Sequence, residues 1–352
     1  RRPRISVGYV IAGVVAVALV GILAWWLTRP TVHEPTPDAK LLYDRGVAAM
    51  REGAFFKSSK LLQQAVANDD RFALAHARWA EALTELDLPD DAKNELLVAQ
   101  NLVPNRAALS SVDALRLQAI SDTVTRDFPA AVENYRRLVA MVPATEKAFA
   151  LVDLGRAQEK GEQLQEAIDS YRQATQIDPH NAAAFLRLGV ALGRAQKYQE
   201  AESALKQAND RFDVSNEVEG ITEVLLQRGS LLQQQGKTAD AEIAFGKALE
   251  RSTSLENNDQ RIRTLQHLSN NFILAGNATK AQQYSEQAMA LARSNRMENR
   301  TTLGLIEIGR AYMILGNNSE AEKNFNEGLR LAQLYKGRYA EARAQLALGA
   351  LR

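Results

Sequence analysis

Residues 148–181 read AFALVDLGRAQEKGEQLQEAIDSYRQATQIDPHN, and residues 182–213 read AAAFLRLGVALGRAQKYQEAESALKQANDRFD. Both stretches carry one pattern, and matching positions lie 34 residues apart (155 to 189). Small residues match small ones, and bulky residues match around them: Gly155 and Gly189, Ala167 and Ala201, Leu151 and Phe185, Leu154 and Leu188, Tyr171 and Leu205. Two antiparallel helices approach closely only where side chains are small. Each stretch therefore predicts a helical hairpin in which Gly155, or its counterpart, packs against Ala167.

The ends of these stretches carry helix signals. Asp178-Pro179 follows the second helix of the first copy, and proline cannot continue a helix because it lacks the amide donor. Asn181 then stands where its side chain can cap the next helix. A single hairpin cannot bury its apolar face alone, so each copy must lean on the next. The pattern predicts an all-α solenoid whose stability is a sum of nearest-neighbour contacts.

Similar copies occupy the rest of residues 39–352. After residue 213 the spacing becomes 40, as the glycines Gly236, Gly276 and Gly316 show. The six extra residues fall between hairpins, so either the second helices or the polar loops are longer there. Ser285 stands where the neighbouring copies have Phe245 and Phe325. We expect about eight hairpins and the first helix of a ninth.

The period of 34 residues and its Gly and Ala positions resemble the tetratricopeptide repeat. This resemblance implies a right-handed α-solenoid whose concave side is formed by one face of each first helix. A protein or peptide ligand is the partner that such a groove implies, with arginine able to bind a carboxylate through two hydrogen bonds. The candidate groove residues are Phe149, Val152, Arg156, Leu186, Val190, Arg194, Gln266, Asn270, Ile306, Arg310 and Met313.

The N-terminal region predicts a membrane anchor. Residues 5–27 are uncharged and would form a helix about 34 Å long, enough to cross a bilayer core of roughly 30 Å. Three arginines in the basic flank 1–4, against Arg29 alone beyond the helix, place the N-terminus in the cytoplasm. Residues 28–38 form a Pro-rich linker. We therefore expect a single-pass protein of the inner (cytoplasmic) membrane with its repeat array, residues 39–352, outside the cytoplasm.

Composition and motifs argue against chemistry within this chain. The 43 basic and 42 acidic residues give a net charge of +1, which does not favour nucleic acid binding. Cys is absent, the four histidines lack ligand spacing, and no phosphate-binding glycine motif occurs. We expect no catalytic, cofactor or metal site here, and no enzyme activity.

Residues 72–88, 113–128 and 147–159 are similar to the region beyond the membrane helix in bacterial receptor-like Ser/Thr protein kinases. This resemblance implies a kinase domain upstream of Arg1 and a sensor role for the array, with possible self-association of anchored chains. Two alternatives share the layout. One is the sensor part of a membrane-bound winged-helix transcriptional regulator, and the other is a stand-alone anchored scaffold for envelope assembly.

Overall fold

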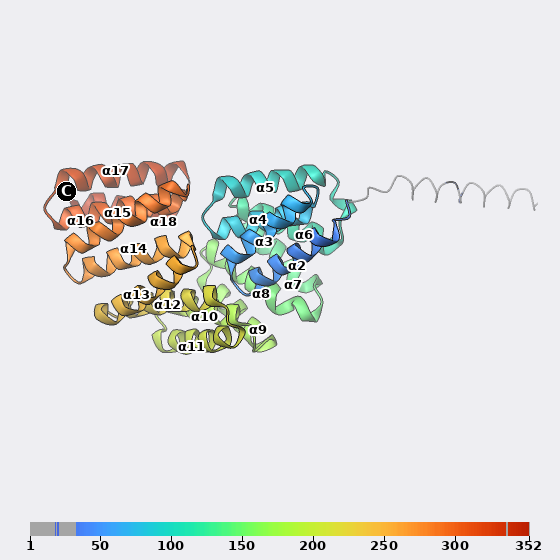
Figure 1. Cartoon of the computed structure of the whole chain (residues 1–352), viewed down its shortest axis with the longest axis horizontal. Helices are drawn as coiled ribbons and strands as arrows, with labels where there is room; N and C mark the ends of the chain where they lie inside the picture. Colours follow the sequence, from blue (N-terminus) through green and yellow to red (C-terminus); the bar gives the residue numbers. More distant parts are fainter. Residues whose placement is uncertain (1–17, 19, 21–32, 336, 352) are drawn as a thin grey trace, which may run out of the picture.

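The computed structural model describes residues 33–335 and 337–351, together with residues 18 and 20. This part of the chain is all-α, and its seventeen α-helices follow one another in pairs (Figure 1). A single 3-10 turn, η1 (Arg106–Ala108), separates the second and third pairs. The helices are α2 (Pro37–Arg51), α3 (Phe55–Asn68), α4 (Ala73–Glu85), α5 (Pro89–Leu102), α6 (Ser111–Val124), α7 (Phe128–Met141), α8 (Ala144–Lys160), α9 (Leu164–Ile177), α10 (Ala182–Arg194), α11 (Tyr198–Ser215), α12 (Val218–Gln234), α13 (Thr238–Ser254), α14 (Asn258–Leu274), α15 (Ala278–Ser294), α16 (Glu298–Ile314), α17 (Asn318–Leu334) and α18 (Arg338–Leu351).

These pairs are the predicted eight hairpins, and α18 is the additional helix. The predicted flank 1–4, the membrane helix 5–27 apart from residues 18 and 20, and residues 28–32 of the linker lie outside the described residues. Among the helices that are described, none combines the length and the apolar character needed to span a membrane. Helix α2 begins at Pro37, two residues before the predicted start of the array, with Thr36 as its N-cap.

The hairpins stack in chain order and the stack curls. Each helix packs on the next one, and most first helices also contact the first helix of the following hairpin. Figure 1 shows α2–α7 on one side and α14–α18 on the other, joined below by α9–α11. The curl brings remote hairpins together, since Glu219 of α12 accepts hydrogen bonds from the α3 backbone 163 residues earlier. The expectation of nearest-neighbour contacts alone is therefore wrong.

One pair of residues marks the point where the two helices of a hairpin cross. The first-helix residue at the crossing faces the second-helix residue sixteen positions later, as in Gly155–Tyr171 and Gly189–Leu205. A Cβ added at Gly155 would lie 2.4 Å from the Tyr171 ring. The small residue therefore makes room for the ring of Tyr171. The same pairing recurs in Gly229–Phe245 and Gly309–Phe325.

Ser285 keeps this pairing by a different means. Its partner sixteen positions earlier is Ser269 instead of glycine, and the two buried hydroxyls lie 2.5 Å apart. Ser269 also donates to the Ala281 carbonyl at 2.9 Å. Two small polar residues thus replace one glycine and one phenylalanine, while the neighbouring Tyr284 stacks on Phe272.

The helices account for part of the longer period. Helices α12 to α17 have 17 residues each, whereas the fourth hairpin has 17 residues in α8 and 14 in α9, and the fifth has 13 in α10 and 18 in α11. The loops between the longer hairpins are short, as between α13 and α14. The longer hairpins thus lack the one short helix that the fourth and fifth hairpins each contain. The predicted cap at Asn181 is confirmed, because its side chain accepts the Ala184 amide at 3.0 Å.

Candidate functional site

The inner surface of the curl contains a row of cavities that we call the lumen. A cavity of about 30 Å³ at the N-terminal end shares Gly53, Phe55, Ala183 and Arg187 with a second cavity of about 330 Å³. The second shares Val190, Arg194 and Gln227 with a third of about 420 Å³. Shared walls make the lumen continuous from α2 to α14.

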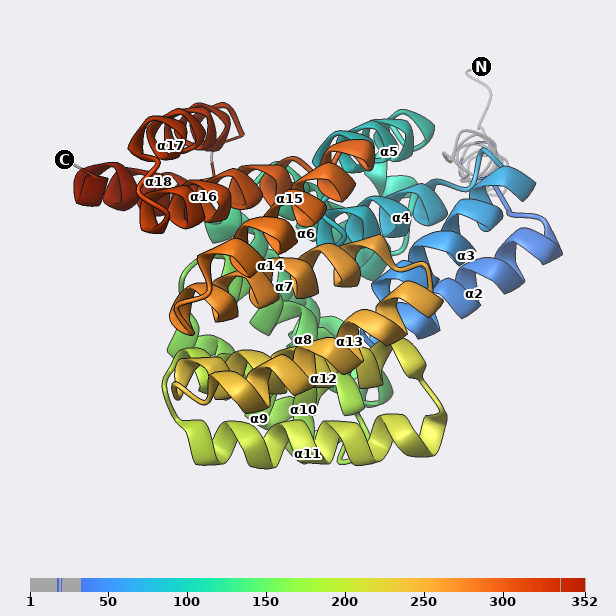
Figure 2. The same cartoon turned by 60° about the vertical axis from the view of Figure 1, so that its left-hand side comes forward.

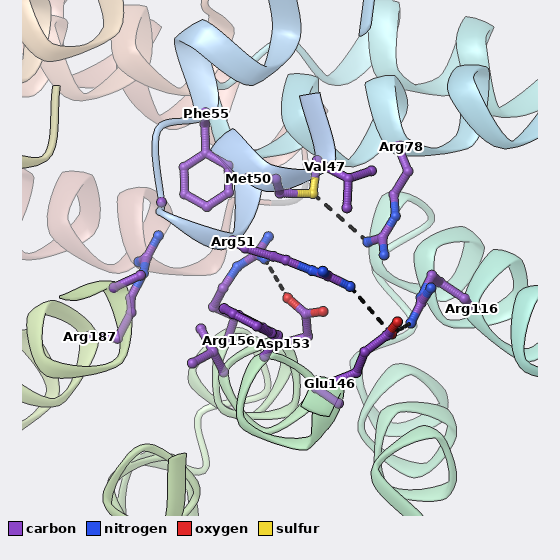
Figure 3. A pocket seen from close by; sticks show the side chains of 15 residues that line it. Val47, Met50, Arg51, Phe55, Arg78, Arg116, Glu146, Asp153, Arg156 and Arg187 are labelled. Carbon is purple, nitrogen blue, oxygen red and sulfur yellow. Dashed lines mark hydrogen bonds and ion pairs between the residues drawn. The ribbon is translucent and has the colours of Figure 1, made fainter. Parts of the chain in front are cut away.

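Five arginines surround the first cavity, which we call the arginine pocket (Figure 3). They are Arg51 of α2, Arg78 of α4, Arg116 of α6, Arg156 of α8 and Arg187 of α10. Each comes from the first helix of one of the first five hairpins. The stacking of successive hairpins therefore converts one arginine per hairpin into a single cationic cluster.

Two carboxylates of α4 stand at the buried side of this cluster. Glu81 lies 2.6 Å from Arg78 Nη1 and 3.4 Å from Arg156 Nη1. Glu85 lies 2.8 Å from Arg156 Nη2 and 2.5 Å from Lys160 Nζ. Both acids belong to a helix two hairpins before their α8 partners, so they fasten hairpin two to hairpin four.

Two carboxylates of α8 complete the network. Asp153 lies 3.0 Å from Arg156 Nη1, and Glu146 lies 3.3 Å from Arg116 Nη2 and 3.4 Å from Arg51 Nη2. Six cationic side chains, the five arginines and Lys160, thus face four acids. The net positive charge of two favours an anionic ligand.

Burial and ion pairing act in opposite directions on these acids. Burial alone would raise the pKa of Glu85, but Arg156, Lys160 and Arg187 outweigh it and hold this pKa well below its usual value. The pKa of Glu81 is lowered as well, since Arg78 and Arg156 outweigh its burial. Burial and the nearby Glu81 raise the pKa of Asp153. Glu81 and Glu85 therefore remain ionised and neutralise only part of the cluster.

Hydrogen-bond donors of the cluster remain unused. The Nε atoms of Arg78, Arg116 and Arg156 are buried without a hydrogen-bond partner. Aromatic rings line the same pocket, with Arg156 4.9 Å from the Phe55 ring centre and Arg51 4.9 Å from that of Phe149. An aliphatic or aromatic group that carries a carboxylate matches such a wall.

The predicted groove residues divide into two groups. Phe149, Val152 and Arg156 line the arginine pocket, and Leu186, Val190 and Arg194 line the next cavity of the lumen. The structure therefore brings the residues of the fourth and fifth hairpins to one continuous surface.

The predicted residues of the seventh and eighth hairpins mainly connect neighbouring hairpins. Gln266 donates to the Arg300 carbonyl at 2.7 Å, and Arg310 donates to Asn270 Oδ1 at 2.8 Å. Ile306 is fully buried beside Gly328, and Met313 packs on the same cluster. Ile306 is therefore a core residue and offers no surface to a ligand, because the longer helices pack against each other there.

The predicted groove residues include none from the first three hairpins, which contribute Arg51, Arg78 and Arg116 to the pocket. The first and third of these hairpins match the repeat pattern least well. One signal could have found the acids, since Glu81 and Glu85 each precede their α8 partners by 75 residues. Extending the register of the fourth copy backwards places both acids on the inner face. No group of His, Asp and Glu suited to hold a metal ion occurs among the described residues.

Known repeat families match three parts of the chain. Models described as "Tetratricopeptide repeat" match residues 221–294 and 304–334, and one described as "TPR repeat" matches residues 155–196. These parts of the chain are tetratricopeptide repeats. The match to helix pairs in both the shorter and the longer hairpins shows that the two periods are variants of one repeat.

Relatives and solved structures agree with this assignment. The Small glutamine-rich tetratricopeptide repeat-containing protein 2 of Mycosarcoma maydis is 31% identical over 120 residues, which are 33% of this chain and 32% of the relative. This chain thus spans about a third of the length of that relative. The Rap protein complexed with Competence and Sporulation Factor has a TM-score of 0.61 at 14% identity, over 90% of this chain and 98% of Rap. NprR in complex with its cognate peptide NprX has a TM-score of 0.55 at 15% identity, over 80% and 82% of the two chains. At these identities the likeness shows that the tetratricopeptide fold is shared.

Proposed function

We propose that this chain binds a peptide, or an extended segment of a partner protein, inside the lumen. The observation that carries the proposal is the arginine pocket, where one arginine from each of five hairpins meets a partly apolar wall. Rap and NprR, which share the fold, are described in complex with a factor and with a peptide. This similarity supports a peptide-sized ligand.

A carboxylate of the ligand would be the anchoring group. It would accept hydrogen bonds from the partly exposed arginines Arg51, Arg116 and Arg187, while Glu81 and Glu85 hold Arg78 and Arg156 in place. The neighbouring apolar atoms of Phe149 and Val152 would contact the adjoining side chain of the ligand. Both charge and shape then select an acidic residue or a chain terminus next to an apolar residue.

The first prediction concerns binding. Arg51→Ala and Arg116→Ala should each weaken a lumen-binding peptide about 10- to 100-fold, because a hydrogen bond to a charged group contributes about 1.5–3 kcal/mol. The measurement is fluorescence polarisation with peptides selected on this chain from a random library that has free carboxyl termini.

Arg228→Ala is the matched control. Arg228 is half exposed and pairs with Glu202, and it lines none of the three cavities of the lumen. Its removal should leave the peptide affinity unchanged. Equal affinity of all three variants, or equal binding of peptides whose carboxylates have been converted to amides, would refute the anchoring role of the arginine pocket.

The proposal also includes the membrane anchor of the array and the domain that precedes it. The uncharged run 5–27 after Arg1, Arg2 and Arg4 supports an array anchored by one membrane helix and facing away from the cytoplasm. We place a Ser/Thr kinase domain upstream, with the array as its non-catalytic sensor. A winged-helix regulator and a stand-alone envelope scaffold are the competing assignments. The reading frame upstream of Arg1 separates the three, and a reporter enzyme active only outside the cytoplasm, fused after residue 352, tests the orientation.

A further inference from the structure

Two helices of the array are capped by carboxylates from remote hairpins. Helix α3 starts after Ala54 and α16 starts after Met297, and neither of these residues provides a side-chain cap. The first amides of a helix have no acceptor within the helix. Glu219 of α12 accepts the Phe56 amide at 2.9 Å and the Lys57 amide at 3.1 Å.

Asp87 does the same for α16. Its carboxylate accepts the Arg300 amide at 2.9 Å and the Asn299 side-chain amide at 2.5 Å, across 213 and 212 positions of the sequence. Asp87 lies in the turn between α4 and α5 with φ at 62°, a backbone state that Arg126, Glu162 and Gln196 also adopt in the turns of the next hairpins. The turn conformation is therefore general to the repeat, and what distinguishes Asp87 is its contact with α16.

The contact between Glu219 and α3 lies between the lumen and the outer surface of the protein. Glu219 lines the 330 Å³ cavity of the lumen and also an outer cleft of about 660 Å³ between the first and sixth hairpins. Gly53 and Phe55, at the start of α3, form the lumen wall next to it. Lys57 adds an ion pair to Glu217 at 2.5 Å. Figure 2 shows α2 and α3 at the edge of the curl, next to the ends of α12 and α13.

The contact is local and polar. No extended helix-on-helix packing joins α3 to α12, whereas α2 and α3 pack extensively on each other. Separation of the first hairpin from α12 would break these polar contacts, together with the ion pair of Arg51 with Glu146 and the contacts of the Phe55 ring with Arg156 and Arg187. It would open the side of the lumen beside Phe55, which is also a wall of the arginine pocket.

We infer that the first hairpin is a movable wall of the lumen, that Glu219 on the α3 N-terminus holds it closed, and that its opening admits the ligand. Asp87 on the α16 N-terminus is the second closing contact of the same curl. The claim of closure stands by itself, while the claim of ligand entry rests on the proposed function.

Closure should depend on pH. Burial, with Glu217 and Glu223 adding to it, raises the pKa of Glu219 from 4.5 to about 7, although the Phe56 and Lys57 amides act in the opposite direction. Burial also raises the pKa of Asp87. Glu219 thus binds a proton more readily in the closed form than in the open form. Its protonation stabilises the closed form fully below about pH 4.5, and this stabilisation is lost as the pH rises through about 7. A protonated carboxyl still offers its carbonyl oxygen to one amide.

Other charged groups around Glu219 come from the first hairpin, α10 and α14. None of them reverses the expected loss of closure at high pH. The first hairpin contributes Glu52 and Lys57, and the lumen wall contributes Arg187 of α10 and Asp259 and Arg263 of α14. Arg263 is engaged by Glu223 at 2.6 Å. The pH dependence therefore reflects mainly the desolvation of Glu219.

The test uses the full chain without peptide. Because the chain has no cysteine, Lys60→Cys on one side of the outer cleft and Ser215→Cys, next to Asn216 on the other side, accept spin labels on an unlabelled background. We expect one short distance at pH 6, and an added longer component at pH 8.5. Glu219→Ala should show the long component at both pH values. Glu219→Gln, which cannot ionise, should give the same distances at both.

Hydrogen exchange gives an independent reading. The Phe56 and Lys57 amides should exchange at least tenfold faster in Glu219→Ala, whereas the Ala130 amide, capped locally by Asp127, should not change. Glu166→Ala removes a solvent-exposed acid from the first turn of α9 and should have no effect. Distances and exchange rates that stay unchanged in Glu219→Ala would overturn the closure.

Peptide kinetics separate the two claims. A peptide selected for the binding prediction should associate at least threefold faster with Glu219→Ala than with the unsubstituted chain at pH 6. Equal rates, with the wall shown to be open, would overturn the entry role. If the library yielded no peptide that binds the chain, the proposed function would be contradicted and the closure result would still stand.

Discussion

Replacing Glu81 by alanine is expected to lower the free energy of unfolding by about 3–5 kcal/mol, because it leaves the buried Arg78 guanidinium without the carboxylate with which it is paired and removes one of the carboxylates around Arg156. Arg78 and Arg156 are 5% and 7% exposed, so water cannot replace the lost partner. Urea denaturation followed by circular dichroism at pH 7 measures the change.

Two variants control this experiment. Glu81→Gln keeps the shape and one acceptor, and it should fall between alanine and the natural residue. Glu202→Ala removes a half-exposed partner of Arg228 and should cost less than about 1 kcal/mol. If Glu81→Ala were as mild as Glu202→Ala, the buried network would have no role in fastening hairpin two to hairpin four.

The second large effect is expected at Gly155. A methyl group there would meet the ring of Tyr171, which is fully buried and cannot move aside. Gly155→Ala should therefore destabilise the array by about 1–3 kcal/mol, as overpacking of a tight core does. Thermal unfolding of the two proteins, compared at one concentration, measures it.

Gly246 provides a control at which alanine should raise the stability instead of lowering it. It lies inside α13 on an exposed face, and nothing stands within 4 Å of an added Cβ. Gly246→Ala should stabilise the helix by about 0.5–1 kcal/mol, since alanine loses less conformational freedom than glycine. A stabilising effect of Gly155→Ala as well would mean that the hairpin crossing tolerates a side chain.

The hairpins could be predicted from sequence because their contacts are local. Gly155 and Tyr171 are sixteen residues apart, and Asn181 caps the helix that follows it, so one repeat contains both signals. A pattern of small residues does not show which bulky neighbour fills the space, so the contact of Gly155 with the Tyr171 ring is not predicted by the sequence.

The arginine pocket, and the capping of α3 by Glu219 and of α16 by Asp87, depend on the curvature of the stack of hairpins. Small rotations between successive hairpins add up along a solenoid, and no single repeat records their sum. Glu219 looks like an ordinary acid in the first turn of α12, and Asp87 like an ordinary turn residue. Only the accumulated curl places them on the first amides of α3 and α16.

The distance along the chain between Glu219 and α3 has a consequence during synthesis. A ribosome that adds 5–20 residues per second needs roughly 10 to 30 s to make the 163 residues between Phe56 and Glu219. For that time the nascent first hairpin has two uncapped amides and no partner across the lumen. The first hairpin is therefore open to chaperones and proteases for longer than it would be if its partner across the lumen followed it directly in the sequence.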